Sequence, residues 1–312
     1  MPTSKTHKAT LAEYELALLW GSWVELGVSG WQRTHSNWTI DPEPLIIRTA
    51  ALGDADPRLR DEALDWCIHN WRYASRVRLR NLLRGQGDEA DEAWGRFAAT
   101  VNTHSKARWP NATQGIRYVV TSRSSLESME QPSRAWIRLR AMFGLGARTE
   151  ILRYFLSGQR RATVATIADN VGYTKRNVAD ECDSLEKAGV LKMRRMGNRF
   201  YYTLGRTAEL RDFAGAIAPI QPAWTSLFNV TSTFVALEAA SETLPADALM
   251  VEAHRVTRVL DDKLDALGIE ERPRLVQRDD FWPTVRDFAD KYMSSWSAGQ
   301  WMPNEGEIKL TS

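Results

Sequence analysis

A short basic run, Thr-Lys-Arg-Asn at positions 174 to 177, holds the side chains best suited to chemistry. Arginine can donate two hydrogen bonds to guanine and asparagine can pair with adenine, so Arg176 and Asn177 match the edges of base pairs. Thr174 is the expected N-cap of a helix, and Lys175, Arg176 and Asn177 would then occupy its first turn. In a helix-turn-helix the N-terminal residues of the second helix contact the major groove, so we expect these four residues to read bases.

A second basic group surrounds a Gly-Asn pair at positions 197 and 198. The runs VLKMRRM and RFYYTL on either side are strand-like, and a Gly-Asn pair between two such runs predicts a hairpin. Arg194, Arg195, Asn198 and Arg199 would lie at its tip. Arginine suits a narrow, negative groove, so we expect this hairpin to contact the minor groove or the phosphate backbone.

Helices must position these two groups. Residues 148–156 and about 164–170 are predicted as the first two helices of the motif, on the spacing of their apolar residues. Gly172 permits the left-handed backbone of a tight turn before the third helix, which ends at Gly189. The apolar residues of the third helix repeat at helical spacing: Val178, Cys182 and Leu185.

Residues 145–206 resemble the winged helix-turn-helix of bacterial regulators of the arsenic-repressor (ArsR) and multiple-antibiotic-resistance (MarR) types. The matching elements are Ile167-Ala168, Gly172, Thr174 to Val178, the run LEKAGVL from Leu185 and the tyrosine-rich last strand. The resemblance covers under a quarter of the chain. It implies binding of double-stranded DNA, with residues 174–177 reading bases and Arg194, Arg195, Asn198 and Arg199 forming the wing. The chain departs from the pattern because long helical regions flank the motif and the metal-binding cysteines of arsenic repressors are absent.

The charge of the chain is unevenly distributed. Residues 134–206 carry 15 basic and 6 acidic side chains, a net charge of +9. Residues 1–133 carry 16 of each, and residues 207–312 carry 10 basic and 17 acidic side chains, a net charge of −7. A local basic excess is an electrostatic footprint for phosphates. We expect a tryptophan-rich helical domain at 1–133, a winged helix-turn-helix DNA-binding domain at 134–206, and an acidic helical domain for dimerisation or partner binding at 207–312.

The expected fold is therefore mainly α, with helical regions on both sides of a central winged helix-turn-helix that has a two-stranded wing. Residues 108–133 are less regular and are expected to be a connection. The amphipathic helices expected within 220–267 are candidates for a dimer interface. Four arginines would share one face of a helix and could extend the DNA surface, stay solvated or pair with the acidic C-terminal region: Arg72, Arg76, Arg80 and Arg84.

Other kinds of chemistry have little support in the sequence. Its histidines and two cysteines lack zinc-site spacing, so we expect no metal and no cofactor. No phosphate-binding loop or Ser/His/Asp constellation can be defended, so we do not expect an enzyme. The absence of a CxxC pair, of a signal-peptide pattern and of any apolar run near the ~20 residues of a membrane span favours a cytoplasmic protein without a membrane partner.

These patterns predict a sequence-specific, double-stranded DNA-binding transcriptional regulator, a repressor or autoregulator that acts as a homodimer on pseudo-palindromic sites. The alternative is an antitoxin-like protein that neutralises a toxin-like partner and binds its own operator. Residues 23–46 (WVELGVSGWQRTHSNWTIDPEPLI) resemble uncharacterised proteins paired with nucleotidyltransferase-type toxins. A winged helix used only for protein contacts is the third interpretation.

Overall fold

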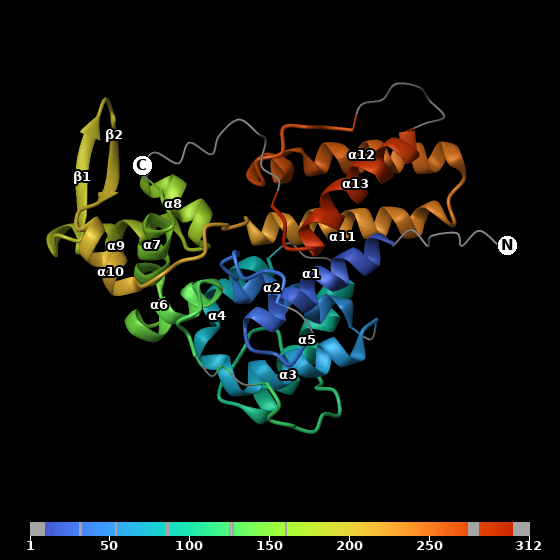
Figure 1. Cartoon of the computed structure of the whole chain (residues 1–312), viewed down its shortest axis with the longest axis horizontal. Coiled ribbons are helices and arrows are strands. Elements are labelled where there is room, and N and C mark those ends of the chain that lie inside the picture. The colour runs from blue at the N-terminus through green and yellow to red at the C-terminus, as the bar shows by residue number, and fades with distance from the viewer. Residues whose placement is uncertain are drawn as a thin grey trace. The chain divides into compact units, whose positions relative to one another are not determined.

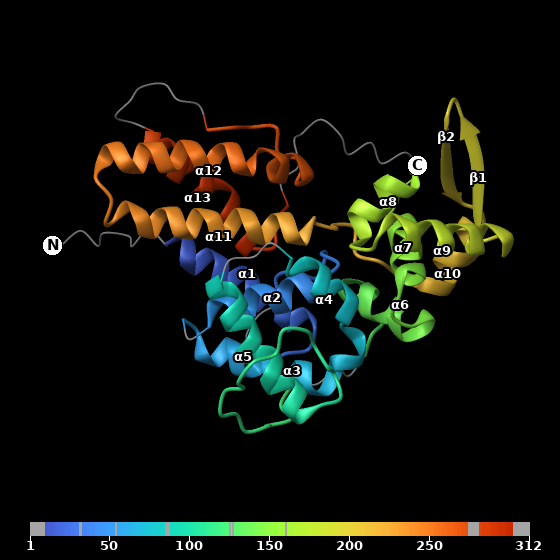
Figure 2. The ribbon, with the colours of Figure 1, turned by 180° about the vertical axis from the view of Figure 1, so that it is seen from behind.

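The computed structural model of the chain is predominantly helical (Figures 1 and 2). It describes residues 10–30, 33–53, 55–84, 88–124, 126, 128–159, 161–273 and 281–301. In these ranges the only sheet is a two-stranded antiparallel ribbon, which confirms the predicted mainly α fold with a two-stranded wing. The described residues divide by their contacts into two compact units: those within 23–30 and 36–221, and those within 10–22, 33–35 and 222–301.

The first half of the larger unit is a group of helices around buried tryptophans. These helices are α2 (Pro42–Leu52), α3 (Pro57–Asn70), α4 (Arg76–Leu82) and α5 (Asp88–His104). Prolines begin α2 and α3, where the missing N–H is not needed by the helix. Trp23, at the end of α1 (Leu11–Glu25), packs edge-on against Trp66 with ring centroids 5.4 Å apart. Each indole is satisfied, because Trp23 donates to Thr49 and Trp66 donates to the carbonyl of Leu26.

The described residues between α5 and the short 3-10 helix Pro132–Arg134 form no helix or strand, as expected for residues 108–133. This stretch is nevertheless ordered by one buried carboxylate. Asp65 of α3 accepts hydrogen bonds of 2.9–3.0 Å from the backbone N–H groups of Thr121, Ser122 and Ser124. These bonds lower the pKa of Asp65 although burial alone would raise it.

The second half of the larger unit contains the predicted motif. Its elements are α6 (Ala135–Phe143), α7 (Ala147–Leu156), α8 (Val164–Val171), α9 (Lys175–Lys187), β1 (Leu191–Met196), β2 (Arg199–Leu204) and α10 (Thr207–Ala214). Helices α7, α8 and α9 pack together, and the ribbon follows directly on α9 (Figure 1). An isolated bridge pairs Ala162, which precedes α8, with Tyr202 of β2. Three helices followed by a hairpin are the elements, in the order, that the sequence predicts for residues 145–206.

The motif has its own apolar core. Val178, Cys182 and Leu185 of α9 are buried against residues of α7 and α8, as their spacing predicted. Burial raises the pKa of the Cys182 thiol to about 12, so this cysteine is a neutral core residue rather than a thiolate ligand.

The predicted helix face of four arginines is wrong. α4 contains only seven residues, Arg76–Leu82, while Arg72 lies in the preceding 3-10 turn Trp71–Tyr73. The chain is extended at Ala74 and Ser75, and the Ser75 hydroxyl caps a new helix by accepting from the N–H of Arg78. The i, i+4 spacing therefore crosses a helix boundary, and only Arg76 and Arg80 of the set share a helix face.

The smaller unit contains α11 (Trp224–Ser241), α12 (Ala246–Ala266), α13 (Phe281–Ser297) and most of α1. α11 and α12 run antiparallel, side by side, in both Figures 1 and 2. Phe234 of α11 meets Phe288 of α13 edge-on at 6.0 Å. The division of the chain at 133/134 and 206/207 into three domains stays a prediction about which parts fold independently.

Candidate nucleic-acid interface

The predicted base-reading residues lie in the exposed first turn of α9. Thr174 is its N-cap, and its hydroxyl oxygen accepts a hydrogen bond of 3.3 Å from the N–H of Asn177. Lys175, Arg176 and Asn177 are all exposed, whereas Val178, the next residue, is fully buried. The helix therefore directs its buried face into the motif and leaves its basic first turn accessible. Thr174 has a structural role in this arrangement whether or not it also contacts a base.

The wing is a regular hairpin whose loop is Gly197-Asn198. Gly197 has a φ of 58°, the positive value that the first position of such a two-residue turn requires. Side chains alternate between the two faces of a strand, so Arg194 and Arg195 point to opposite faces of the ribbon. The cross-strand pairs are Arg194 with Tyr201, Arg195 with Phe200 and Met196 with Arg199. Arg194 and Arg199 consequently share one face.

Arg195 folds back onto the hairpin. Its Nε donates to the carbonyl of Gly197 at 3.2 Å, and its guanidinium lies 6.0 Å from the ring of Phe200. Phe200 itself is 51% exposed at the tip of the wing. The four predicted wing residues are thus all exposed, but Arg195 is partly engaged by the hairpin while Arg194 and Arg199 have no ion pair within the described chain.

A hydrogen bond fixes the wing to the helix it follows. The Tyr202 hydroxyl donates to the carboxylate of Asp183 in α9 at 2.9 Å. On the edge of β2 that faces away from β1, Tyr202 exchanges two backbone hydrogen bonds with Ala162. Since α9 has 13 residues, its first turn and the base of the wing are about 20 Å apart, so the two basic groups do not form one cluster.

One further basic residue lies against the wing. Arg161, in the loop before α8, is exposed and stacks over the ring of Tyr201 with its guanidinium 5.7 Å from the ring centroid. It also donates to the sulfur of Met196 at 3.5 Å, so it lies on the same face of the wing as Arg194 and Arg199. The basic character of the loop is visible in the sequence, but its pairing with the wing is not.

The turn before α9 is held from outside the motif. Gly172 has a φ of 71°, and a side chain there would also lie 3.4 Å from Nε of Arg78. Asn81 of α4 donates its side-chain amide to the carbonyl of Gly172 at 2.9 Å. The hydroxyls of Ser75 and Tyr173 lie 3.0 Å apart, so the N-cap residue of α4 contacts the residue directly before Thr174.

A buried cluster of charges connects α7 to the helices that precede the motif. Arg140 of α6 bonds to Glu43 of α2 at 2.7 Å and to Glu150 of α7 at 2.7 Å. Arg78 of α4 pairs with Asp41 at 2.7 Å and also contacts Glu43. Arg153 pairs with Glu150 at 3.2 Å, which balances three guanidinium groups against three carboxylates. All six side chains are buried, and the cluster crosses the predicted boundary at 133/134.

Trp136 lies at the centre of this buried charge cluster. Its indole N–H donates to Glu150, and the guanidinium groups of Arg78, Arg140 and Arg153 lie 3.8–5.6 Å from its ring centroid. Burial alone would raise the pKa of Glu150, but Arg140 and the other two arginines outweigh it and lower that pKa to about 2. The cluster is therefore a charged structural core.

The buried cluster changes the meaning of the net charge. Arg140, Arg153 and Arg134 belong to the basic residues that were counted in 134–206, yet all three are buried. Arg134 donates to backbone carbonyls, including that of Glu25. Part of the net charge of +9 on residues 134–206 is therefore internal and cannot contact a ligand. The exposed basic residues are concentrated in α9, in the wing and in the loop before α8.

A Ser/His/Asp group that the sequence could not reveal lies away from this surface. Ser122 Oγ is 3.2 Å from Nε2 of His69, and Nδ1 of His69 is 2.7 Å from the carbonyl oxygen of Asp65. The carboxylate of Asp65, however, is 4.0 Å from His69 and is occupied by backbone N–H groups. The group is best explained as the anchor of the loop after residue 117.

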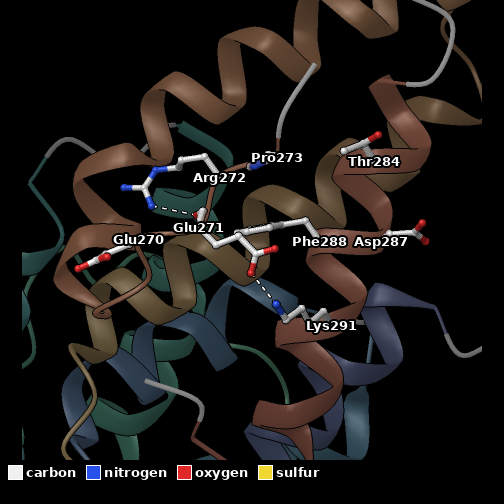
Figure 3. Close-up of a pocket in the computed structure, with 8 residues that line it drawn as sticks. All are labelled: Glu270, Glu271, Arg272, Pro273, Thr284, Asp287, Phe288 and Lys291. Carbon is white, nitrogen blue, oxygen red and sulfur yellow. Dashed lines mark hydrogen bonds and ion pairs between the residues drawn. The ribbon is translucent and has the colours of Figure 1, made fainter. Parts of the chain in front are cut away.

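The smaller unit has an open hollow of about 890 Å³ beside α13 (Figure 3). Figure 3 shows Lys291 directed at Glu271, and the two are 2.5 Å apart. Arg272 is paired with Asp261 and Asp265 of α12. The lining of this hollow combines acidic and basic side chains with the ring of Phe288, so the hollow is not a basic surface.

The described part of the chain holds no group of three or more His, Cys, Asp or Glu side chains arranged for a metal ion. None of its described helices combines the length and apolarity needed to cross a bilayer. Comparison with protein-family models, with curated proteins and with solved structures finds no match to this chain.

Proposed function

We propose that this protein is a sequence-specific, double-stranded DNA-binding transcriptional regulator of the cytoplasm, acting as a repressor or autoregulator. The observation that carries the proposal is the exposed basic first turn of α9, in a chain order of three helices followed by a basic hairpin. Lys175, Arg176 and Asn177 would contact bases in the major groove, because an α-helix fits that groove and these side chains match base edges. Arg194 and Arg199, with Arg161, would contact phosphates or the minor groove.

The wing and the first turn of α9 should contribute to different properties of DNA binding. Base contacts determine which sequence is bound, whereas phosphate contacts determine overall affinity and its salt dependence. The separation of the two basic groups along α9 supports this division of roles. A homodimer on a pseudo-palindromic operator remains part of the proposal, with the amphipathic helices α11 and α12 as candidates for its interface.

The test is selection of bound sequences from a pool of random duplexes by the full chain. We expect enrichment of one motif by the wild type and loss of that enrichment in a Lys175→Ala/Arg176→Ala variant. An Arg194→Gln/Arg199→Gln variant should enrich the same motif with weaker binding. Recovery of no motif by the wild type, or of the same motif by the Lys175→Ala/Arg176→Ala variant, would contradict the assignment.

The alternative is an antitoxin-like interaction protein that binds both a partner protein and its own operator. The acidic balance of residues 207–312, opposite in sign to residues 134–206, supports a second interaction of different chemistry. Purification of the chain from native cells distinguishes the two, since a stoichiometric protein partner supports the antitoxin-like function and its absence supports a stand-alone regulator.

A further inference from the structure

The segment 71–84 (WRYASRVRLRNLLR) contains five arginines and no acidic residue. One of them, Arg78, is buried in the charge cluster and paired with Asp41 and Glu43. The other four are exposed, and none forms an ion pair with another residue of the described chain: Arg72, Arg76, Arg80 and Arg84. Four uncompensated positive charges on so short a segment form a surface that favours an anion.

This surface is attached to the turn that precedes α9. Ser75 contacts the hydroxyl of Tyr173, and Asn81 donates to the carbonyl of Gly172. Val77 packs against the apolar core of the winged helix. Arg76 lies between Ser75 and Val77 in the chain, and Arg80 directly precedes Asn81. Each exposed arginine of α4 is therefore the immediate neighbour of residues that contact the motif.

The two arginines also share one face of α4. Positions i and i+4 lie one above the other on a helix, so Arg76 and Arg80 point in similar directions. Arg78 occupies the opposite side of α4, and Leu79, which lies beside the arginine face, is also buried. Arg78 connects α4 through Glu43 and Arg140 to Glu150 of α7, so α4 and the motif share one buried core. The position of α4, which carries Arg76 and Arg80, is thus fixed relative to the motif.

We propose that Arg76 and Arg80 bind phosphates of the DNA backbone beside the groove that α9 reads. Arginine is suited to this contact because its planar guanidinium can donate two parallel hydrogen bonds to a phosphate. Arg72 and Arg84 lie at the two ends of the same segment and add to the local positive charge. This inference rests on the proposed function, and it gives the helices before the motif a part in DNA binding.

The test compares two double variants of the full chain in duplex binding measured over a range of salt concentrations. Arg76→Gln/Arg80→Gln removes the proposed contacts. Arg96→Gln/Arg117→Gln is the matched control, since both arginines are exposed in the same unit and α5, which carries Arg96, packs on α2 and α3. Thermal unfolding of both variants should match the wild type, because all four side chains are exposed.

We expect Arg76→Gln/Arg80→Gln to weaken binding roughly tenfold or more, for selected and unrelated duplexes alike, and to reduce the slope of log K against log salt by about 2. The sequence preference and the control should be unchanged. Unaltered affinity and slope in Arg76→Gln/Arg80→Gln would overturn the inference. It would also be overturned if this variant bound DNA as the wild type does but no longer bound an acidic protein partner. If the wild type binds no duplex, the proposed function itself fails, which separates the two failures.

Discussion

The side-chain amide of Asn81 donates a 2.9 Å hydrogen bond to the backbone carbonyl of Gly172, which joins α4 to the turn between α8 and α9. The carbonyl belongs to a residue in the left-handed conformation, at the end of α8 and two residues before the cap of α9. The direction of the exposed first turn of α9 therefore depends on a helix nearly a hundred residues earlier in the chain.

Asn81→Ala should lower the free energy of unfolding by about 1 kcal/mol, because the carbonyl of Gly172 loses its partner. The matched control is Asn170→Ala. The side chain of Asn170 bonds only to the carbonyl of Thr166 within its own helix, so this change should stay within about 0.5 kcal/mol. Chemical denaturation measures both. Equal effects of the two substitutions would show that the contact between α4 and the turn contributes nothing specific.

Glu150→Gln should destabilise the larger unit by roughly 3–5 kcal/mol, because it leaves Arg140 and Arg153 buried without their shared carboxylate. Glu181→Gln is the control. It removes the partner of Arg148 at an exposed site, where an ion pair is worth about 0–1 kcal/mol. Denaturation curves that place the two variants within 1 kcal/mol of each other would contradict a structural role for the buried cluster.

The same carboxyl group predicts an acid limit for the fold. The pKa of Glu150 is lowered to about 2 in the folded chain, from an ordinary value of 4.5, so its ionisation stabilises the folded state above pH 4.5. This contribution, about 3 kcal/mol, is lost as the pH falls from 4.5 towards 2. The difference in unfolding free energy between wild type and Glu150→Gln should shrink over that window. If this difference in unfolding free energy stays constant between pH 4.5 and pH 2, the ionised Glu150 carboxylate does not stabilise the fold.

His35 predicts a separate pH dependence for the smaller unit. Its ring is buried between the hydroxyl of Thr34 and the carbonyl of Trp296, and burial lowers its pKa from 6.5 to about 4. The unfolded chain therefore takes up a proton at higher pH than the folded chain, and stability falls as the pH drops from 6.5 to 4. Between pH 7 and pH 5 the loss should be about 2 kcal/mol. A His35→Gln variant should lack this slope, and an identical slope in both proteins would refute the account.

Gly21→Ala should destabilise the chain, although glycine-to-alanine changes inside helices usually stabilise by about 1 kcal/mol. A methyl group at Gly21 would lie 2.3 Å from Nδ1 of His35 and 2.5 Å from the hydroxyl of Thr34, so something must move. Overpacking of this kind typically costs about 1–3 kcal/mol. Gly146→Ala is the control, since its methyl group meets no atom within 4 Å. A more stable Gly21→Ala protein would show that the side chains of His35 and Thr34 move away from the new methyl group at little cost in free energy.

The motif was predictable because its signals are local. Gly172 at the turn, Thr174 at the cap and Gly197-Asn198 at the hairpin each determine the backbone of the residues beside them. Helical spacing placed Val178 and Cys182 in the core for the same reason. These features depend on neighbours within a few positions, which a single sequence displays.

The supports of the motif were not predictable because their contacts join distant parts of the chain. Arg140 and Arg153 look like surface charge in the sequence, and only their contacts with Glu43 and Glu150 show that they are internal. The spacing of the arginines from Arg72 to Arg84 predicted one helix face, which the extended backbone at Ala74 and Ser75 interrupts. No periodicity in the sequence indicates that Asn81 contacts Gly172.

We propose that the exposed first turn of α9 reads DNA sequence. This role is tested by the ratio of affinities for a selected duplex and a scrambled one, measured by fluorescence anisotropy for the wild type and for Lys175→Ala/Arg176→Ala. Lys187→Ala/Arg211→Ala is the matched control, since both of its residues are exposed within the same unit. We expect a wild-type ratio of about a thousand or more, a fall to near 1 in Lys175→Ala/Arg176→Ala, and the wild-type ratio in the control. A ratio that survives the loss of Lys175 and Arg176 would contradict the claim.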